Sequence, residues 1–234
     1  MTTARSGLVK TDKGQQTRAS ILEAALEMFR EQGYEQTTMR AIADRAGVAL
    51  GNAYYYFHSK EHLIQAFYGR THEAHLRSCD SLLAEESELK PRLLGVMRAK
   101  IATIEPYHQF AGKLFKTAAD PQSPLNPFSD ESDPVRRDSI ALFEAIVTGS
   151  TTRVPKDLMI ELPYMLWLYH MGIILFWIHD PSPRRIRTHR LIDRSVDILA
   201  KLIALASNPL MRPLRKSALR LMSELRQDVA VMAN

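Results

Sequence analysis

The sequence predicts an all-α protein built from a small N-terminal head and a larger helical body. Apolar residues recur every three or four positions along most of the chain, which is the spacing of amphipathic helices. No long run alternates between apolar and polar residues, and neither Asn-Gly nor Asp-Gly occurs to turn a β-hairpin. Glycines and prolines interrupt the helical pattern and separate one element from the next.

The first helix is predicted to run from a polar cap to a closing glycine. Asp12 can cap its N-terminus, with Gln15 in the reciprocal position three residues later. Apolar residues then recur at helical spacing until Gly33 ends the helix. Residues 1–13 are polar and basic with no apolar segment, so we expect a loose basic arm and no signal peptide.

Three short helices are expected to follow. Thr37 or Thr38 caps the first of them, and Gly47 ends it. The next covers residues 50–57, and Ser59 caps the last. Two short helices joined at a glycine have the proportions of a helix-turn-helix. With the first helix, these two form an expected three-helix head.

Longer helices are expected to form the body. They cover residues 89–104, 107–119, 134–148, 156–179, 184–206 and 213–231, with an acidic loop over residues 125–134. We expect one domain over residues 1–70 and a second over residues 71–234. The most apolar stretch, residues 162–178, is shorter than the ~20 residues that span a bilayer. It predicts a buried helix and no membrane partner.

The composition suits a protein of the cytoplasm. The single cysteine, Cys79, excludes an intramolecular disulfide, as is usual in a reducing compartment. The net charge of +5 permits a polyanionic partner, but the basic surplus lies in residues 181–234, with eleven Lys or Arg against four Asp or Glu. Net charge alone therefore does not point to the head as a nucleic-acid surface.

The segment after Gly47 carries side chains suited to DNA. A glycine inside a helix costs roughly 1 kcal/mol, and close approach of the backbone to a phosphate would explain Gly51. Tyr54, Tyr55 and Tyr56 cannot all be buried on one helix, so at least one hydroxyl faces outward and can donate to a phosphate. Lys60 adds a cation beside the free N–H groups of a helix start.

At these residues the chain resembles the TetR family of repressors. The matching segments are residues 29–34, 37–38, 42–48, 51–57 and 59–63, and the resemblance covers residues 17–68, about a fifth of the chain. One position departs from the pattern, because Leu50 stands where relatives often carry a polar base reader. We therefore expect few direct hydrogen bonds to bases from this position. Arg40, or the arm with Arg5, Lys10 and Lys13, would compensate.

The resemblance implies a dimeric repressor whose two heads enter successive major grooves of double-stranded operator DNA. A helical domain in each subunit would bind a small effector, and the last long helices would form the homodimer interface. Carried over position by position, the residues facing DNA are Thr38, Arg40, Ala49, Leu50, Gly51, Tyr54, Tyr55 and Lys60. Ile42 and Phe57 are expected to be structural.

Aromatic and apolar residues of the body form the expected effector site. They are Tyr107, Phe110, Leu114, Phe115, Phe143, Tyr164, Trp167, Leu168 and Met171. Such a wall suits a small, largely apolar ligand that would release the repressor from its operator. The alternative for each residue is a purely structural place in the hydrophobic core. The family resemblance, and not the composition, implies the pocket.

The apolar residues 170–179 and the helix after them form the expected dimer face. A helix that is apolar on nearly every side must be covered all round, and packing between subunits is one way to cover it. The residues of this face are Ile174, Trp177, Ile178, Leu191, Ser195, Ile198, Leu199 and Leu202. A core within one chain is the alternative.

Other function classes have weaker support in the sequence. Gly-x-Ser-x-Gly, Gly-x-x-x-x-Gly-Lys and His-Glu-x-x-His are absent from it, so we expect neither an enzyme nor a cofactor. His72, His75 and Cys79 can share a helical face, which leaves a metal-responsive repressor as one alternative. No second Cys or His cluster completes a tetrahedral site, so no metal ligand is assigned. A helical binding module without DNA activity is the other alternative.

Overall fold

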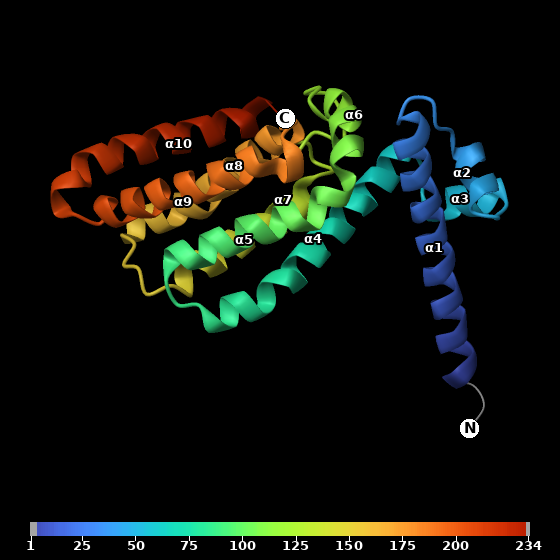
Figure 1. Ribbon diagram of the computed structural model, residues 1–234, viewed down its shortest axis with the longest axis horizontal. Coiled ribbons are helices and arrows are strands. Elements are labelled where there is room, and N and C mark those ends of the chain that lie inside the picture. The colour runs from blue at the N-terminus through green and yellow to red at the C-terminus, as the bar shows by residue number, and fades with distance from the viewer. Residues whose placement is uncertain (1–3, 233–234) are drawn as a thin grey trace. The chain divides into compact units, whose positions relative to one another are not determined.

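The structure is a computed structural model that describes residues 4–232, and the side chains of residues 12–224. Within those residues every regular element is a helix, which confirms the predicted all-α class (Figure 1). The chain divides into two compact units, residues 1–71 with 107–135 and residues 72–106 with 136–234. The expected division at residue 70 stays a prediction, and it differs from these units in where residues 107–135 belong.

The first unit is built from short helices around one long helix. It contains α1 (Ala4–Gln32), α2 (Met39–Arg45), α3 (Leu50–Tyr56), the beginning of α4 (Lys60–Glu85) and α6 (His108–Ala118). These elements begin and end close to the predicted residues, except at the start of α1 and the end of α4.

Helix α1 starts at Ala4, so the prediction of a loose arm and a cap at Asp12 is wrong. Polar side chains in this stretch bond to the helix's own backbone, as when the Thr17 hydroxyl donates to the carbonyl of Lys13 at 2.9 Å. Such local bonds let polar residues continue a helix as well as cap one. The side chains of Arg5 and Lys10 lie outside the described residues.

Large apolar side chains form the core of the first unit. Those with no exposed surface include Ile21, Leu26, Phe29, Ile42, Phe57 and Leu63. Phe110 of α6 stacks on Phe29 with ring centroids 5.8 Å apart, and Phe67 of α4 meets Phe110 edge-on at 5.6 Å. Burial of each such side chain contributes about 1.5–3 kcal/mol. This core fixes α2 and α3 to α1, and Ile42 and Phe57 belong to it as expected.

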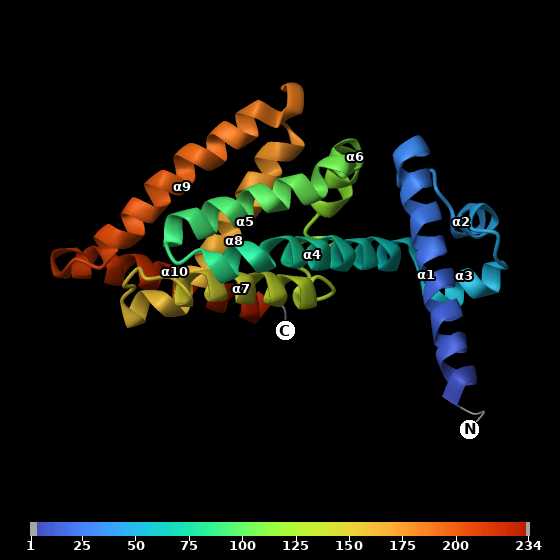
Figure 2. The same ribbon diagram turned by 60° about the horizontal axis from the view of Figure 1, so that its bottom comes forward.

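The second unit is a bundle of long helices. It contains the rest of α4, α5 (Leu89–Ile104), most of α7 (Asp133–Thr148), α8 (Lys156–Ile178), α9 (Ile186–Ala206) and α10 (Arg212–Met232). Helix α9 packs against α5 and α8, and α10 packs against α8 (Figure 2). The helical pattern predicted the bounds of α5 and of α7 to α10 to within two residues.

Helix α4 continues to Glu85, so the prediction of a short fourth helix is wrong. The helix accommodates one glycine, Gly69, and no proline follows it until Pro91. Without a breaker the helical pattern simply continues. One helix therefore supplies residues to both units.

A buried arginine holds helix ends together in the second unit. The Arg92 guanidinium donates to the carbonyls of Leu83 and Glu86, at 2.8 and 2.6 Å, and to those of Ala145 and Ile146, at 3.1 and 3.0 Å. The last carbonyls of a helix have no partner within it, so one cation here satisfies the ends of both α4 and α7. This role of Arg92 was not predicted from the sequence.

Of the described helices, α8 has the length and hydropathy of a membrane span, a test that buried core helices also pass. Its buried residues include Leu162, Leu166 and Ile173. Because it also packs against α9 and α10, its contacts fit the predicted buried helix.

Candidate functional site

Helices α2 and α3 form a helix-turn-helix with ordered caps. The Thr38 hydroxyl accepts a hydrogen bond from the N–H of Ala41 at 3.2 Å and so caps α2. At the other end Gly47 has a φ of +67°, a left-handed conformation that glycine adopts without strain. The N–H of Val48 then donates to the carbonyl of Ala43 at 3.0 Å, which closes the turn before α3.

The two helices present an exposed face. Six of the residues expected to face DNA are exposed on it: Thr38, Arg40, Ala49, Gly51, Tyr54 and Tyr55. Tyr55 is 77% exposed and Tyr54 is 46% exposed, whereas Tyr56 is half-buried. Two of the three tyrosines therefore present surface to solvent, in keeping with the argument that one helix cannot bury all three.

Gly51 has open space beside it. A Cβ added at this position would meet no atom within 4 Å, and its φ is not positive. The packing of this unit therefore gives no reason for a glycine here. An approaching partner that must come close to the backbone would give one.

Lys60 and Leu50, the other two residues expected to face DNA, have structural roles in this unit. The Lys60 ammonium donates to the carbonyls of Tyr34 and Glu35, at 2.8 and 3.4 Å. It also lies 4.4 Å from the centroid of the Tyr34 ring. Leu50 is half-buried and packs against the core. Contact of these two with DNA stays a prediction.

A tyrosine and a glutamate join the same two chain segments. The Tyr34 hydroxyl donates to the Glu61 carboxylate at the start of α4. Burial and this hydrogen bond raise the pKa of Tyr34 well above its ordinary value, so it is a neutral donor. The connection from α1 to α2 is thus held to α4 by both Lys60 and Glu61, and this positions α2.

Asn52 is an exposed polar residue on the same face of α3 that the sequence analysis did not assign to DNA. It lies inside the segment that carries the family resemblance. Its amide can both donate and accept, which suits a base edge. The exposure of α3, rather than a sequence pattern, is what makes it a candidate.

The nine residues expected to line an effector site are divided between the two units. Tyr107, Phe110, Leu114 and Phe115 belong to the first, and Phe143, Tyr164, Trp167, Leu168 and Met171 belong to the second. Phe110 and Leu114 are buried in the core of the first unit. In the second unit Phe143 and Trp167 are buried, and Tyr164 stacks on Trp167 with ring centroids 5.5 Å apart. Most of these side chains have core contacts, and their contact with an effector stays a prediction.

A polar cluster lies inside the second unit. It consists of His72 and His75 of α4 and His170 of α8, and all three histidines are buried. The rings of His75 and His170 are nearly parallel with centroids 6.3 Å apart, and those of His72 and His75 are 6.4 Å apart. From the sequence, His72 and His75 were considered only as metal ligands, and His170 was not associated with them.

Burial lowers the pKa of all three histidines and so keeps them neutral. It lowers the pKa of His75 to about 3 and that of His170 well below its ordinary range, and the Lys100 charge lowers both further. Burial also lowers the pKa of Lys100 to about 8, which leaves it mostly protonated at neutral pH.

The metal-responsive alternative gains no support from the structure. His75 Nε2 donates to the carbonyl of Val96 at 3.0 Å, and Cys79 is buried with a raised pKa. Among the described residues, no three His, Cys, Asp or Glu side chains are grouped so that they can hold a metal ion. We therefore do not retain His72, His75 and Cys79 as a metal site.

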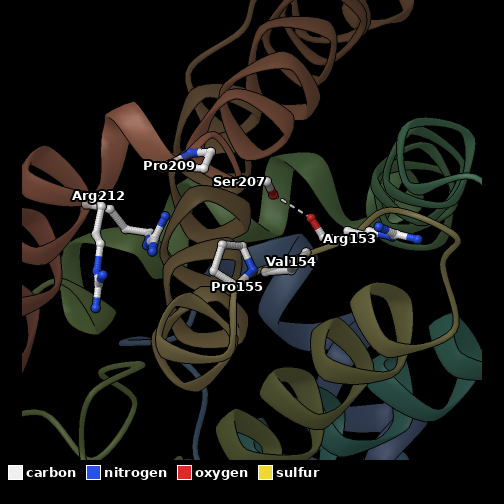
Figure 3. A pocket seen from close by; sticks show the side chains of 7 residues that line it. Arg153, Val154, Pro155, Ser207, Pro209 and Arg212 are labelled. Carbon is white, nitrogen blue, oxygen red and sulfur yellow. Dashed lines mark hydrogen bonds between the residues drawn. The ribbon is translucent and has the colours of Figure 1, made fainter.

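A surface pocket of about 410 Å³ lies between the start of α8 and the connection from α9 to α10. It is lined by Arg153, Val154, Pro155, Ser207, Pro209, Arg212 and Arg215. Arg215 is already bonded to the Asp157 carboxylate at 3.1 Å. Figure 3 shows the side chains of Arg153 and Arg212 on opposite sides of Pro155, so their guanidinium groups do not converge.

The expected dimer face is partly exposed. Ile198 and Leu202 of α9 are 58% and 55% exposed. Other large apolar residues exposed nearby in the sequence are Leu205, Leu210, Leu214 and Leu221. Ile174, Ile178, Leu191, Ser195 and Leu199 are half-buried. An apolar surface on α9 and α10 is thus available to a partner.

Trp177 was expected on that dimer face, and its burial contradicts the assignment. It is 1% exposed within the single chain, and its indole N–H donates to the Glu105 carboxylate at 2.7 Å. The side chain is part of the core of the second unit, so it offers no surface to another subunit.

Models of two protein families match the chain. The model described as "Bacterial regulatory proteins, tetR family" matches residues 21–67. The model described as "Tetracyclin repressor-like, C-terminal domain" matches residues 92–221, more than half of the chain. The first match contains the helix-turn-helix, and the second lies largely in the longer helices.

Curated relatives match about two fifths of the chain. The transcriptional regulator TtgR of Pseudomonas putida is 42% identical over 88 residues, which cover 37% of this chain and 40% of TtgR. The repressor KstR2 of Mycobacterium tuberculosis is 36% identical over 92 residues, which cover 39% of this chain and 46% of KstR2. The chain spans about two fifths of the length of the curated relatives it matches. These relatives are transcription regulators, not enzymes.

Solved structures share the fold over most of the chain. A TetR transcriptional regulator from Nitrosomonas europaea has a TM-score of 0.61 at 15% identity, and the match covers 77% of this chain and 96% of that one. The regulator FadR from Bacillus subtilis, solved with stearoyl-CoA, has a TM-score of 0.61 at 17% identity, covering 78% and 97%. At these identities the likeness shows the fold alone.

Proposed function

Because the chain belongs to the TetR family of bacterial regulatory proteins, we propose that it represses transcription by binding double-stranded operator DNA through α2 and α3. The observation that carries this proposal is the exposed face of the helix-turn-helix, with Arg40, Gly51, Tyr54 and Tyr55 upon it. Arginine and tyrosine side chains donate to phosphates, and a bare glycine lets the backbone come close to one. The rigid core below this face supports a fixed orientation of these groups in the groove.

An effector is proposed to control this binding from the second unit. Helix α4 supplies residues to both units, so a ligand that shifts α4 in the body would also move the head. The ligand must bind the DNA-incompetent state more tightly to have this effect. We infer a small, largely apolar ligand, as the buried aromatic side chains of Phe143 and Trp167 suggest.

We further propose a homodimer that acts in the cytoplasm. The exposed Ile198 and Leu202 of α9 support an interface between copies, since apolar surface of this kind is usually covered. Two heads related by a two-fold axis would read two half-sites of an operator.

Binding to the DNA upstream of its own gene tests the DNA proposal. Purified full-length protein should shift this fragment in a gel in the presence of excess random DNA. A Tyr54→Ala/Tyr55→Ala variant should lose the shift, while the matched control Arg77→Ala, which removes an exposed side chain of α4 in the second unit, should keep it. If the wild-type protein shifts no fragment and genome-wide selection also recovers none, the alternative of a helical binding module without DNA activity is correct.

A further inference from the structure

Arg18 of α1 and His62 of α4 contact the same buried ring. The Arg18 guanidinium lies over Phe57, with its Cζ 4.9 Å from the ring centroid. The His62 imidazole meets Phe57 edge-on, with ring centroids 5.7 Å apart. Phe57 has no exposed surface, whereas Arg18 and His62 are both exposed. The core of the first unit thus fixes a guanidinium and an imidazole at one place on its surface.

His58 completes this group. Its ring stacks on that of His62 with centroids 5.6 Å apart, and its backbone N–H donates to His62 Nδ1 at 3.4 Å. In the tautomer of His62 that accepts this bond, Nε2 carries the proton and is a donor. We refer to Arg18, His58 and His62 as the Arg18 cluster.

The Arg18 cluster has no counter-ion in the part of the chain that the structure describes. No carboxylate there bonds to any of its three side chains. Glu61, next to His62 in the chain, accepts instead from the Tyr34 hydroxyl. Partial burial of the ring and the charges of His58 and Arg18 all lower the pKa of His62, and no negative charge raises it. The cluster is therefore suited to an anion.

This cluster borders the face proposed to read DNA. His58 follows the end of α3 and lies three residues after the exposed Tyr55. Helix α1 is close to the same end of α3, because a Cβ added at Gly14 would lie 3.5 Å from the Tyr56 hydroxyl oxygen. Arg18 lies about one turn further along α1, on the same side of that helix.

We propose that Arg18, His58 and His62 bind a phosphate of operator DNA beside the helix-turn-helix. A backbone phosphate needs donors and positive charge rather than an enclosed cavity, and a guanidinium with imidazole N–H groups supplies both. The cluster would take the place of Lys60, whose ammonium is bonded to carbonyls of the first unit. The assignment rests on the function proposed above and adds a contact that the family resemblance does not imply.

Salt titrations of operator affinity with the full chain test the arginine. The probe is the fragment upstream of its own gene, or the one that genome-wide selection recovers. Arg18→Met should reduce the slope of log affinity against log salt by about one, and Arg18→Lys should restore it. Because Met still covers Phe57, Tm should change little. Lys116→Met removes an exposed cation of α6 in the same unit and should leave the slope unchanged.

The histidines give a second readout. A bound phosphate favours protonated imidazoles, so DNA binding should take up protons. Operator affinity should then rise by about threefold or more from pH 8 to pH 6. His58→Gln/His62→Gln should remove most of this rise. His189→Gln, on α9 of the second unit, is the matched control and should keep it.

Three results would overturn this assignment and leave the proposed function intact. They are a slope that survives Arg18→Met, a pH dependence that survives the double histidine substitution, and a loss of affinity that is equal at every salt concentration and accompanied by a lower Tm. The last would show that Arg18 is structural. If the wild-type protein binds no operator fragment at all, both the function and this assignment are wrong.

Discussion

The ammonium of Lys60 donates to the backbone carbonyl of Tyr34 at 2.8 Å and lies 4.4 Å from the centroid of its ring. This pair ties the beginning of α4 to the turn that follows α1. A cation that a DNA-binding family would direct at a phosphate is thus engaged inside the head. A structural contact with Tyr34 and a contact with a DNA phosphate predict different outcomes when Lys60 is replaced.

Replacing Lys60 should therefore weaken the fold more than the electrostatics of DNA binding. Lys60→Met should lower the free energy of unfolding by about 1–2 kcal/mol, because it removes charge-assisted hydrogen bonds to two carbonyls. Urea denaturation measures this change. If stability is unchanged and the dependence of DNA affinity on salt falls by about one counterion, Lys60 contacts a phosphate instead.

Replacing Gly51 should have the reverse effect of replacing Lys60, because it should weaken DNA binding without weakening the fold. Since a Cβ here would meet nothing within 4 Å, Gly51→Ala should leave the free energy of unfolding unchanged or raise it by about 0.5–1 kcal/mol. The same methyl group should lower operator affinity about tenfold or more, because it separates the α3 backbone from DNA. Anisotropy titrations measure the affinity. Undiminished affinity would mean that no DNA backbone approaches this position.

Charge on the exposed face of α9 should separate the subunits. Ile198→Glu/Leu202→Glu should convert a dimer to monomers in sedimentation experiments, since two buried carboxylates would meet their symmetry mates. Phe128→Glu places one such carboxylate on an exposed aromatic residue of the first unit and serves as the control. A dimer that survives the double substitution would exclude this face.

The histidine cluster predicts acid sensitivity. His75 and His170 have pKa values below that of a histidine in the unfolded chain, about 6.5. Below that pH the unfolded chain takes up protons that the folded chain does not, so stability falls as pH drops from 7 toward 5. Denaturation midpoints across this range measure the slope. His75→Gln/His170→Phe should flatten it, and an unchanged slope would place its origin elsewhere.

Local sequence signals were sufficient for most of the fold. Thr38 and Gly47 mark the ends of α2 because capping and left-handed backbone depend on single residues. The starts of α5 and α8 follow from apolar periodicity. The start of α1 was missed because a possible cap such as Asp12 is also tolerated inside a helix. The end of α4 was missed because a short fourth helix was expected, although no residue in the sequence stops the helix before Glu85.

Side-chain partners across long sequence separations could not be predicted. Nothing near Lys60 in the sequence indicates that its ammonium reaches Tyr34, and nothing near Arg92 indicates that it joins the ends of α4 and α7. The spacing of His72 and His75 was visible, but their neighbour His170 comes from another helix. Tertiary packing decides these contacts, and it brings His170 beside His75.

The most direct test of the central claim is the salt dependence of operator affinity. For the wild-type protein, the logarithm of the association constant should fall linearly with the logarithm of salt concentration, with a slope of several units. Arg40→Ala should reduce that slope by about one, and Arg77→Ala should leave it unchanged. A wild-type affinity that does not change with salt, or a slope that Arg40→Ala leaves intact, would contradict DNA recognition through this face of α2 and α3.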